Sequence, residues 1–387
     1  MNLSKLSKFL LFLVVFALFV TPANISNKQV YATGGELKIS SKSAILVSFD
    51  GEEVLFEKNS EDKLPIASMT KLASLSVIFK VFDRGIIKEN DLVCVSEKAS
   101  RVGGSSAFLD AGSKYKVSDL IKSVILASAN DSTVALAEFV AGSEELFVSK
   151  MNNLCVELGL TNTHFENSTG LPAENHYSTA KDLVKIYKTV CDNPMYKKYS
   201  KLWMEDFIHP SGRKTGLVNT NRLVKTFDGI DGGKTGYTDK ARFCLTASAT
   251  RGDTRFIAVV IGANDSKTRF SEASKLFNYG FANFENKLLV NKDAPVAVHE
   301  FKNAKNQSTI FPEKSLSKFL SKNSNFEFTT DYEIFELKAP INQGDVVGKM
   351  FIFDKDNMVV EEVNLVSGNS VEEKGFKELL GKVISIW

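Results

Sequence analysis

The stretch Ser68-Met69-Thr70-Lys71 lies in an apolar segment, and it governs how the rest of the chain is interpreted. Residues three apart on a helix share one face, so the Lys71 amine can reach the Ser68 hydroxyl. An unassisted serine is a poor nucleophile, but a lysine whose pKa is lowered by burial can accept its proton. The spacing therefore predicts a serine activated by a lysine base. Alone the pattern is weak evidence, because an ordinary core helix can carry the same four residues.

Two further motifs follow in a fixed order. Ser128-Ala129-Asn130 and Lys234-Thr235-Gly236 complete the series S-x-x-K, S-x-N and K-T-G. This ordered triple resembles the penicilloyl-serine transferases, the superfamily of penicillin-binding proteins and serine β-lactamases. Within that superfamily, the chain is most similar to the low-molecular-mass D-alanyl-D-alanine carboxypeptidases. The similarity includes Gly104-Ser105-Ser106 and Phe165 to Pro172.

The resemblance implies roles for the residues of the first two motifs. Ser68 is expected to attack the substrate carbonyl as nucleophile, and Lys71 to take its proton as general base. The Ser128 hydroxyl is expected to relay a proton to the leaving group, while the Asn130 amide orients Lys71 and the substrate. An N-cap supplied by Asn130 or Asp131 to a following helix is the alternative for this motif.

The third motif is expected to bind substrate at a strand edge. Lys234 and Thr235 would hold a terminal carboxylate, and Gly236 would permit close backbone approach. The Tyr237 N–H would complete an oxyanion hole. Arg269 matches an arginine that the family keeps near the carboxylate end of the cleft, with an ordinary surface arginine in a loop as the alternative.

Two other stretches resemble functional motifs but are not expected to form a binding site. A second K-T-G, Lys214-Thr215-Gly216, lacks the flanking residues of the family site and is expected to turn a surface loop. Gly229 to Thr235 is close to a phosphate-binding loop but has three residues, not four, between its glycines.

Residues 1–32 are typical of a secretory signal peptide. Lys5 and Lys8 precede the apolar run Phe9 to Val20, which is short for a membrane span. We expect cleavage after Ala32, with an uncleaved anchor as the alternative. The chain is then exported.

The other end, residues 372–387, is predicted to form an amphipathic helix. Its apolar positions recur at helical spacing and are Phe376, Leu379, Leu380, Val383, Ile384 and Trp387. Related carboxypeptidases end in a similar helix on the outer face of the cytoplasmic membrane, which favours an interfacial location. Packing of this helix on its own domain is the alternative.

Composition excludes several classes of partner and cofactor. The 48 basic and 46 acidic residues nearly balance, so nothing suggests nucleic acid. The cysteines are dispersed, and we expect buried free thiols rather than a disulfide framework; they are Cys94, Cys155, Cys191 and Cys244. The histidines form no ligand pair, so neither metal nor cofactor is expected.

Periodicity predicts an α+β catalytic domain over residues 36–285. Strands are expected at 43–49 and 54–58, joined through Asp50-Gly51, and again at 243–249 and 255–262. Helices are expected at 70–82, 119–126, 131–140, 144–158 and 270–279, with Ser118 and Ser143 as N-caps. A helical cluster on an antiparallel sheet is the β-lactamase/transpeptidase-like fold that the resemblance implies.

In residues 287–370 the helical patterns give way to short β-rich runs. These runs, at 295–301, 326–328, 332–337, 346–353 and 359–366, predict a small all-β sandwich domain. It carries no chemical motif, so a spacer between catalytic domain and membrane is its simplest use.

These expectations combine into a serine-type D-Ala-D-Ala carboxypeptidase. It would remove the terminal D-alanine from peptidoglycan stem pentapeptides through an acyl-enzyme on Ser68, and β-lactams would inhibit it by acylating Ser68. The alternatives are a serine β-lactamase, a peptidoglycan DD-endopeptidase and a non-catalytic sensor of β-lactam or peptidoglycan. Residues 166–170 do not match the glutamate segment of class A β-lactamases, which disfavours the first of these.

Overall fold

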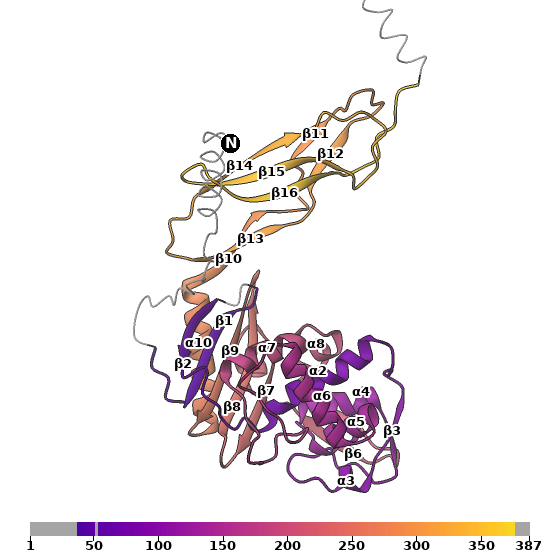
Figure 1. Ribbon diagram of the computed structural model, residues 1–387, viewed down its shortest axis with the longest axis vertical. Coiled ribbons are helices and arrows are strands. Elements are labelled where there is room, and N and C mark those ends of the chain that lie inside the picture. Colours follow the sequence, from indigo (N-terminus) through magenta and orange to yellow (C-terminus); the bar gives the residue numbers. More distant parts are fainter. Residues whose placement is uncertain (1–36, 51–52, 376–387) are drawn as a thin grey trace, which may run out of the picture.

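The computed structural model describes residues 37–50 and 53–375. The predicted signal peptide, residues 1–32, and most of the predicted C-terminal helix, residues 376–387, lie outside that part. Figure 1 shows a lower region of helices and sheet, and above it an elongated region of strands alone.

An antiparallel five-stranded sheet, in the order β2-β1-β9-β8-β7, supports the lower region. Its strands are β1 (Ser43–Ser48), β2 (Val54–Lys58), β7 (Ile230–Thr238), β8 (Arg242–Arg251) and β9 (Thr254–Ala263). The predicted hairpin of β1 and β2 is confirmed, with Ala44 opposite Lys58. Strand β7 lies at one edge of the sheet, so its outer side is free of sheet partners.

Side chains of the central strands alternate between two cores. Ile257 and Val259 of β9 face the helical cluster, whereas Ala258 and Val260 face α10 (Ser266–Asn283). This period of two is the expected geometry of a strand buried on both faces. Figure 1 shows α10 covering one face and the cluster covering the other, which confirms the predicted α+β fold.

Four helices of the cluster lie close to predicted ones: α2 (Lys71–Asp83), α4 (Val117–Leu126), α5 (Asn130–Ala141) and α6 (Glu144–Glu157). The cluster also contains helices that were not predicted: α7 (Ala180–Cys191), α8 (Pro194–Ser200) and the short α3 (Glu97–Ser100) and α9 (Leu223–Thr226). The predicted N-cap Ser143 accepts a hydrogen bond from the Leu146 N–H. The prediction of Ser118 as an N-cap is wrong, because α4 begins at Val117, directly after strand β4 (Lys114–Lys116). Strand β4 pairs with β3 (Leu92–Cys94).

The second K-T-G is also placed differently from expectation. Lys214-Thr215-Gly216 lies in strand β6 (Lys214–Val218), which pairs with β5 (Met204–Ile208). The chain turns earlier, where the Gly212 N–H donates to the His209 carbonyl at 2.8 Å. Gly212 has φ of 85°, a left-handed conformation that glycine adopts without steric cost.

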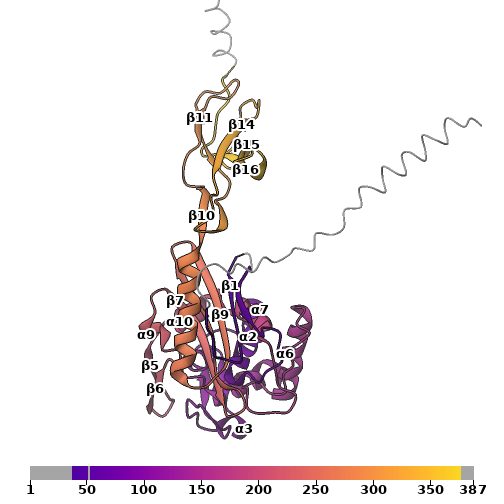
Figure 2. The same ribbon diagram turned by 90° about the vertical axis from the view of Figure 1, so that its left-hand side faces the viewer.

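The upper region is an all-β sandwich, as predicted. One sheet has the order β11-β12-β16-β15-β14 and the other pairs β10 with β13. The strands are β10 (Phe284–Val290), β11 (Ala297–His299), β12 (Ser308–Pro312), β13 (Leu316–Ser321), β14 (Phe328–Ile334), β15 (Val346–Asp354) and β16 (Val359–Ser367). Both sheets contribute to one core, for example through Val290 and Ile352. Figure 2 shows β10 rising directly from the end of α10 into this region.

The prediction of buried free thiols is confirmed for three of the four cysteines and is wrong for Cys94. All four cysteines are free, and all but Cys94 are buried. Within residues 37–50 and 53–375, no helix is both long enough and apolar enough to cross a membrane.

Candidate active site

Ser68 and Lys71 lie where a 3-10 helix, η1 (Ala67–Thr70), passes into α2. The Lys71 Nζ donates to the Ser68 Oγ at 3.0 Å, so the two side chains share one face as expected. Ala67, just before the serine, has φ of 48°, which is unusual for a residue with a Cβ. Such strain is often stored next to functional groups, and here it sets the direction in which Ser68 leaves the backbone.

Lys71 is fully buried and its amine has three hydrogen-bond acceptors. Besides Ser68, its Nζ donates to Asn130 Oδ1 at 2.6 Å and to the Thr169 carbonyl at 2.7 Å. Burial lowers the pKa of Lys71 well below its ordinary value, and the nearby charge of Lys234 lowers it further. The nearby charge of Asp131 raises the pKa of Lys71 and so partly offsets these two effects. A neutral amine within reach of a hydroxyl can serve as a base.

Ser128 connects α4 to α5 in a left-handed conformation, with φ of 61°. That backbone turns its side chain toward β7, where its Oγ accepts a hydrogen bond from Lys234 Nζ at 2.7 Å. The N-cap of α5 is Ala129 and has no side-chain cap, so the capping alternative for this motif is wrong. The Asn130 side chain instead makes two hydrogen bonds. Its Oδ1 accepts from Lys71 Nζ, and its Nδ2 donates to the Gly103 carbonyl at 2.5 Å.

Asp131 holds the neighbouring loop in place. Its buried carboxylate accepts from the backbone N–H groups of Ala107 and Leu109, each at 3.0 Å, and from Ser106 Oγ at 2.5 Å. The same loop contacts the second motif, because the Asn130 N–H donates to the Ser105 carbonyl at 2.7 Å. One rim of the site is therefore fixed to the start of α5.

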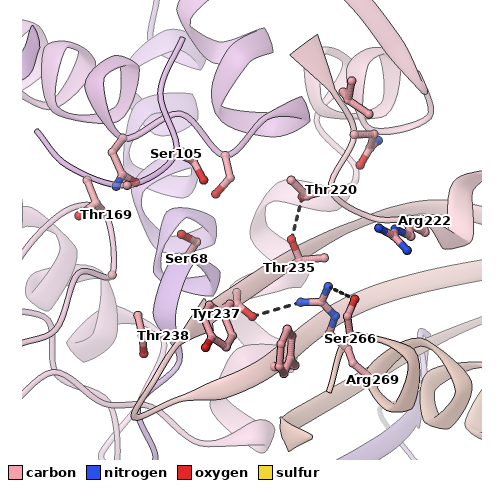
Figure 3. A pocket seen from close by; sticks show the side chains of 18 of the residues that line it. Ser68, Ser105, Thr169, Thr220, Arg222, Thr235, Tyr237, Thr238, Ser266 and Arg269 are labelled. Atoms are coloured by element: carbon pink, nitrogen blue, oxygen red, sulfur yellow. Dashed lines mark hydrogen bonds between the residues drawn. The ribbon is translucent and has the colours of Figure 1, made fainter. Parts of the chain in front are cut away.

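Lys234 and Thr235 lie on the edge strand β7, opposite the first two motifs. Lys234 is almost fully buried, and burial, assisted by the charge of Arg269, lowers its pKa to about 7. Its Nζ donates to Ser128 Oγ and to the Thr235 carbonyl at 2.8 Å. The Thr235 hydroxyl donates to Thr220 Oγ1 at 2.7 Å, a contact drawn in Figure 3.

Gly236 lets β7 approach the nucleophile. A Cβ at this position would lie 2.7 Å from the Ile66 carbonyl oxygen and 3.1 Å from the Ser68 backbone nitrogen. Sequence reasoning linked this glycine to substrate approach, but the close contact is with η1 itself. Tyr237 follows, with its half-exposed ring packed 4.5 Å from that of Phe243.

Arg269 is buried on α10, so its interpretation as an ordinary surface arginine in a loop is wrong. Its Nη1 donates to the carbonyls of Gly236 and Cys244, each at 3.2 Å, and its Nη2 donates to Ser266 Oγ at 3.2 Å. Burial lowers its pKa to about 10, so it stays charged at neutral pH. Figure 3 shows the guanidinium beside Thr235 at one end of the cleft.

These residues surround a cleft of about 810 Å³. Seven predicted residues line it: Ser68, Ser128, Asn130, Thr235, Gly236, Tyr237 and Arg269. Lys71 and Lys234 lie behind this surface and contact it through Ser68 and Ser128. Prediction from sequence missed a wall of the cleft formed by Trp203, Val218, Asn219, Thr220 and Arg222. These five residues form no motif, and only their position ahead of β7 could have indicated them.

No metal site accompanies this cleft. Within the part of the chain that the structure describes, no three His, Cys, Asp or Glu side chains are grouped so that they could hold a metal ion.

Comparison with known proteins identifies the family. Residues 28–265 match the D-alanyl-D-alanine carboxypeptidase family, peptidase S11, and residues 284–373 match the C-terminal domain of penicillin-binding protein 5. The chain therefore belongs to the S11 family of D-alanyl-D-alanine carboxypeptidases.

Individual relatives extend over most of the chain. The D-alanyl-D-alanine carboxypeptidase DacF of Bacillus subtilis is 37% identical over 363 residues, 93% of each chain. DacA of Escherichia coli is 34% identical over 364 residues, 90% of this chain and 87% of the relative.

Solved structures share the fold. Penicillin-binding protein 5 of Haemophilus influenzae matches with a TM-score of 0.66 and 30% identity, covering 88% of this chain and all of the other. Penicillin-binding protein 6B of Escherichia coli matches with a TM-score of 0.67 and 28% identity, over 87% and 98% of the two chains. The fold predicted from the motifs is thereby confirmed.

Proposed function

We propose that the protein is a serine-type D-Ala-D-Ala carboxypeptidase that removes the terminal D-alanine from peptidoglycan stem pentapeptides. The observation that carries the proposal is the meeting of three motifs in one cleft. Lys71 bonds both Ser68 and Asn130, and Lys234 bonds Ser128. Membership of the carboxypeptidase family selects the substrate class.

In the acylation step, Ser68 Oγ attacks the carbonyl carbon of the penultimate D-alanine, and neutral Lys71 takes the hydroxyl proton. The C–N bond to the terminal D-alanine then breaks, and its amine needs a proton. The Ser128 hydroxyl supplies it, and the proton that Lys71 took from Ser68 is passed on to Ser128, so that Lys71 is neutral again. The hydrogen bond from Lys234 Nζ holds the Ser128 hydroxyl in place. An acyl ester on Ser68 and free D-alanine result.

Substrate binding uses the edge of β7. The backbone N–H groups of Ser68 and Tyr237 stabilise the oxyanion. Lys234, Thr235 and Arg269 bind the terminal carboxylate, which a carboxypeptidase must distinguish from an internal peptide bond. Arg269 carries charge and lines the same end of the cleft as Thr235, and Lys234 lies behind this surface with its Nζ bonded to the Thr235 carbonyl.

Water then hydrolyses the acyl ester, with Lys71 again as base. A β-lactam acylates Ser68 in the same way, and we expect its adduct to persist. Glu166 is exposed, and its Oε2 accepts from the Asn175 N–H at 3.3 Å, away from the residues that line the cleft. Because no carboxylate among the described residues lines the cleft to activate water, the β-lactamase alternative has no support here.

We further propose that the protein is exported and held on the outer face of the cytoplasmic membrane. Residues 1–32 act as signal peptide, residues 36–285 as catalytic domain, residues 287–370 as spacer and residues 372–387 as interfacial helix. In support, the chain leaves the sandwich at the end remote from the catalytic region (Figure 1). Co-sedimentation with phosphatidylglycerol vesicles tests this, since a chain ending at Gly375 should lose binding.

The activity is tested by digesting purified peptidoglycan and separating the muropeptides. Loss of pentapeptides with release of D-alanine, while cross-linked dimers persist, is the expected result. Loss of dimers would favour the endopeptidase alternative, and no change in any muropeptide would favour the sensor.

A further inference from the structure

A second, smaller pocket of about 240 Å³ adjoins the cleft. The two share Gly170, Leu171 and Thr238, so the pocket is a lateral extension of the cleft. Its far side carries two lysines from separate elements. Lys63 lies just ahead of η1, and Lys240 lies in the turn between β7 and β8.

The direction of β7 relates this pocket to the substrate. Thr235 and Thr238 are three residues apart on the strand, about 10 Å at the usual rise. Figure 3 shows Thr235 and Arg269 on one side of Ser68 and Thr238 on the other. A peptide whose terminal carboxylate contacts Thr235, and whose scissile carbonyl reaches Ser68, must extend its preceding residues past Tyr237 toward Thr238. The acyl-donor part of the substrate therefore leads into the second pocket.

The charges around the pocket favour an anion. Lys63 and Lys240 are both exposed, and in residues 37–50 and 53–375 neither ammonium forms an ion pair. Lys63 Nζ lies 5.1 Å over the Tyr177 ring, which orients it without neutralising it. Two lysines thus face a single carboxylate in the pocket lining, that of Glu174.

The other titratable groups nearby do not reverse this balance. Asp239 is next to Lys240 in sequence but does not line the pocket, and its carboxylate accepts from the Tyr237 hydroxyl at 2.9 Å. His176 also lines the pocket, and burial lowers its pKa to about 4, so it is neutral at physiological pH.

We propose that the Lys63–Lys240 pocket is a subsite for a carboxylate carried by the acyl-donor part of the substrate, one or two residues before the attacked D-alanine. The inference rests on the proposed function and adds a preference to it. Two positions could present this group: the side chain of the residue directly before that D-alanine, or the free α-carboxylate of a γ-linked glutamate one residue earlier.

The test compares D-alanine release from two matched pairs of peptides. The first pair is N-acetyl-Lys(Nε-succinyl)-D-Ala-D-Ala and its neutral Nε-acetyl partner. The second pair places γ-linked D-glutamate, or its neutral α-amide, ahead of Nε-acetyl-lysine. The double variant Lys63→Gln/Lys240→Gln is compared with wild type and with a control variant, Lys150→Gln. Lys150 is an exposed lysine of α6 that lines neither pocket.

For at least one pair we expect wild type to prefer the acidic peptide by about fivefold in kcat/KM at low salt, with a smaller preference at high salt. The double variant should lose this preference and keep its rate on the neutral peptides, and Lys150→Gln should behave as wild type. The pair that responds identifies the source of the carboxylate.

Equal rates on both members of both pairs, or a preference that survives in the double variant, would overturn the subsite while leaving the carboxypeptidase intact. No D-alanine from any peptide would instead overturn the proposed function, and the subsite with it.

Discussion

Lys234 Nζ donates to the Ser128 hydroxyl at 2.7 Å, across the interface between the edge strand and the helical cluster. On the other side of the cleft, Lys71 joins Ser68 to Asn130. Two buried amines thus connect three motifs that lie far apart in sequence. Burial of two like charges is costly and lowers the pKa of both lysines, and for Lys71 this supplies the neutral amine that a base needs.

Replacing Lys71 by Arg should remove the base while keeping a positive charge. A guanidinium stays protonated in proteins, so it cannot accept the Ser68 proton. We expect acylation by benzylpenicillin to slow by about 10³-fold, measured as the second-order rate constant. In wild type, this rate should fall with decreasing pH as Lys71 becomes protonated. A loss below tenfold in a folded Lys71→Arg variant would argue against Lys71 as base.

The ammonium of Lys234 should make substrate binding sensitive to pH. Its pKa is lowered to about 7, so the amine is increasingly neutral above that pH and attracts a carboxylate less. KM for a D-Ala-D-Ala peptide should then rise above about pH 7 and level off at an increase of about tenfold, because Thr235 and Arg269 still bind the carboxylate. Lys234→Arg keeps its charge and should shift this rise to higher pH. The same rise in both proteins would assign it to another group.

Gly236 and Gly216 form a matched pair within the two K-T-G sequences. A Cβ at Gly236 would collide with the Ile66 carbonyl, whereas a Cβ at Gly216 would meet nothing within 4 Å. Gly236→Ala should push β7 away from Ser68 and lower the acylation rate by about 10²-fold. Gly216→Ala should leave the rate unchanged. Equal effects from the two substitutions would show that the contact with η1 is unimportant.

Protonation of His176 should make the free energy of unfolding depend on pH. Its Nδ1 accepts from the Glu166 N–H at 3.2 Å, so Nε2 carries the proton and donates to Thr70 Oγ1 at 2.7 Å. Burial lowers its pKa from 6.5 to about 4, so between those pH values the unfolded chain binds a proton that the folded chain does not. Stability therefore falls as pH falls through this window, by about 3 kcal/mol for this residue.

Urea unfolding followed by Trp203 fluorescence, in a Trp387→Phe background, measures this effect. His176→Gln should lose less stability than wild type between pH 7 and pH 4. An identical loss in the two proteins would contradict the assignment.

Local sequence patterns predicted many regular elements of the catalytic region, but not α7, α8 or the hairpin of β5 and β6. The hairpin of β1 and β2 and the predicted helices of the cluster depend on spacing, turn residues and caps that act over a few positions. Ser118 shows the limit, because its helix starts from a strand paired with a distant segment. In the sandwich, β10, β12 and β13 were not predicted, since their pairing partners lie far along the chain.

The site was predictable as a set of motifs but not as a complete surface. Ser68, Lys71 and the K-T-G residues carry recognisable patterns. The wall that includes Trp203 and Arg222 comes from a hairpin and a loop whose position depends on tertiary packing. The buried state of Arg269 likewise depends on how α10 packs on the sheet.

The central claim is that Ser68 is an acylated nucleophile in a working carboxypeptidase. The most direct test is intact mass spectrometry of wild type and Ser68→Ala after exposure to benzylpenicillin, with D-alanine release from diacetyl-lysyl-D-Ala-D-Ala followed in parallel. We predict one long-lived adduct on wild type only, together with D-alanine release that Ser68→Ala lacks. No adduct on wild type, or an adduct that persists in Ser68→Ala, would contradict the account.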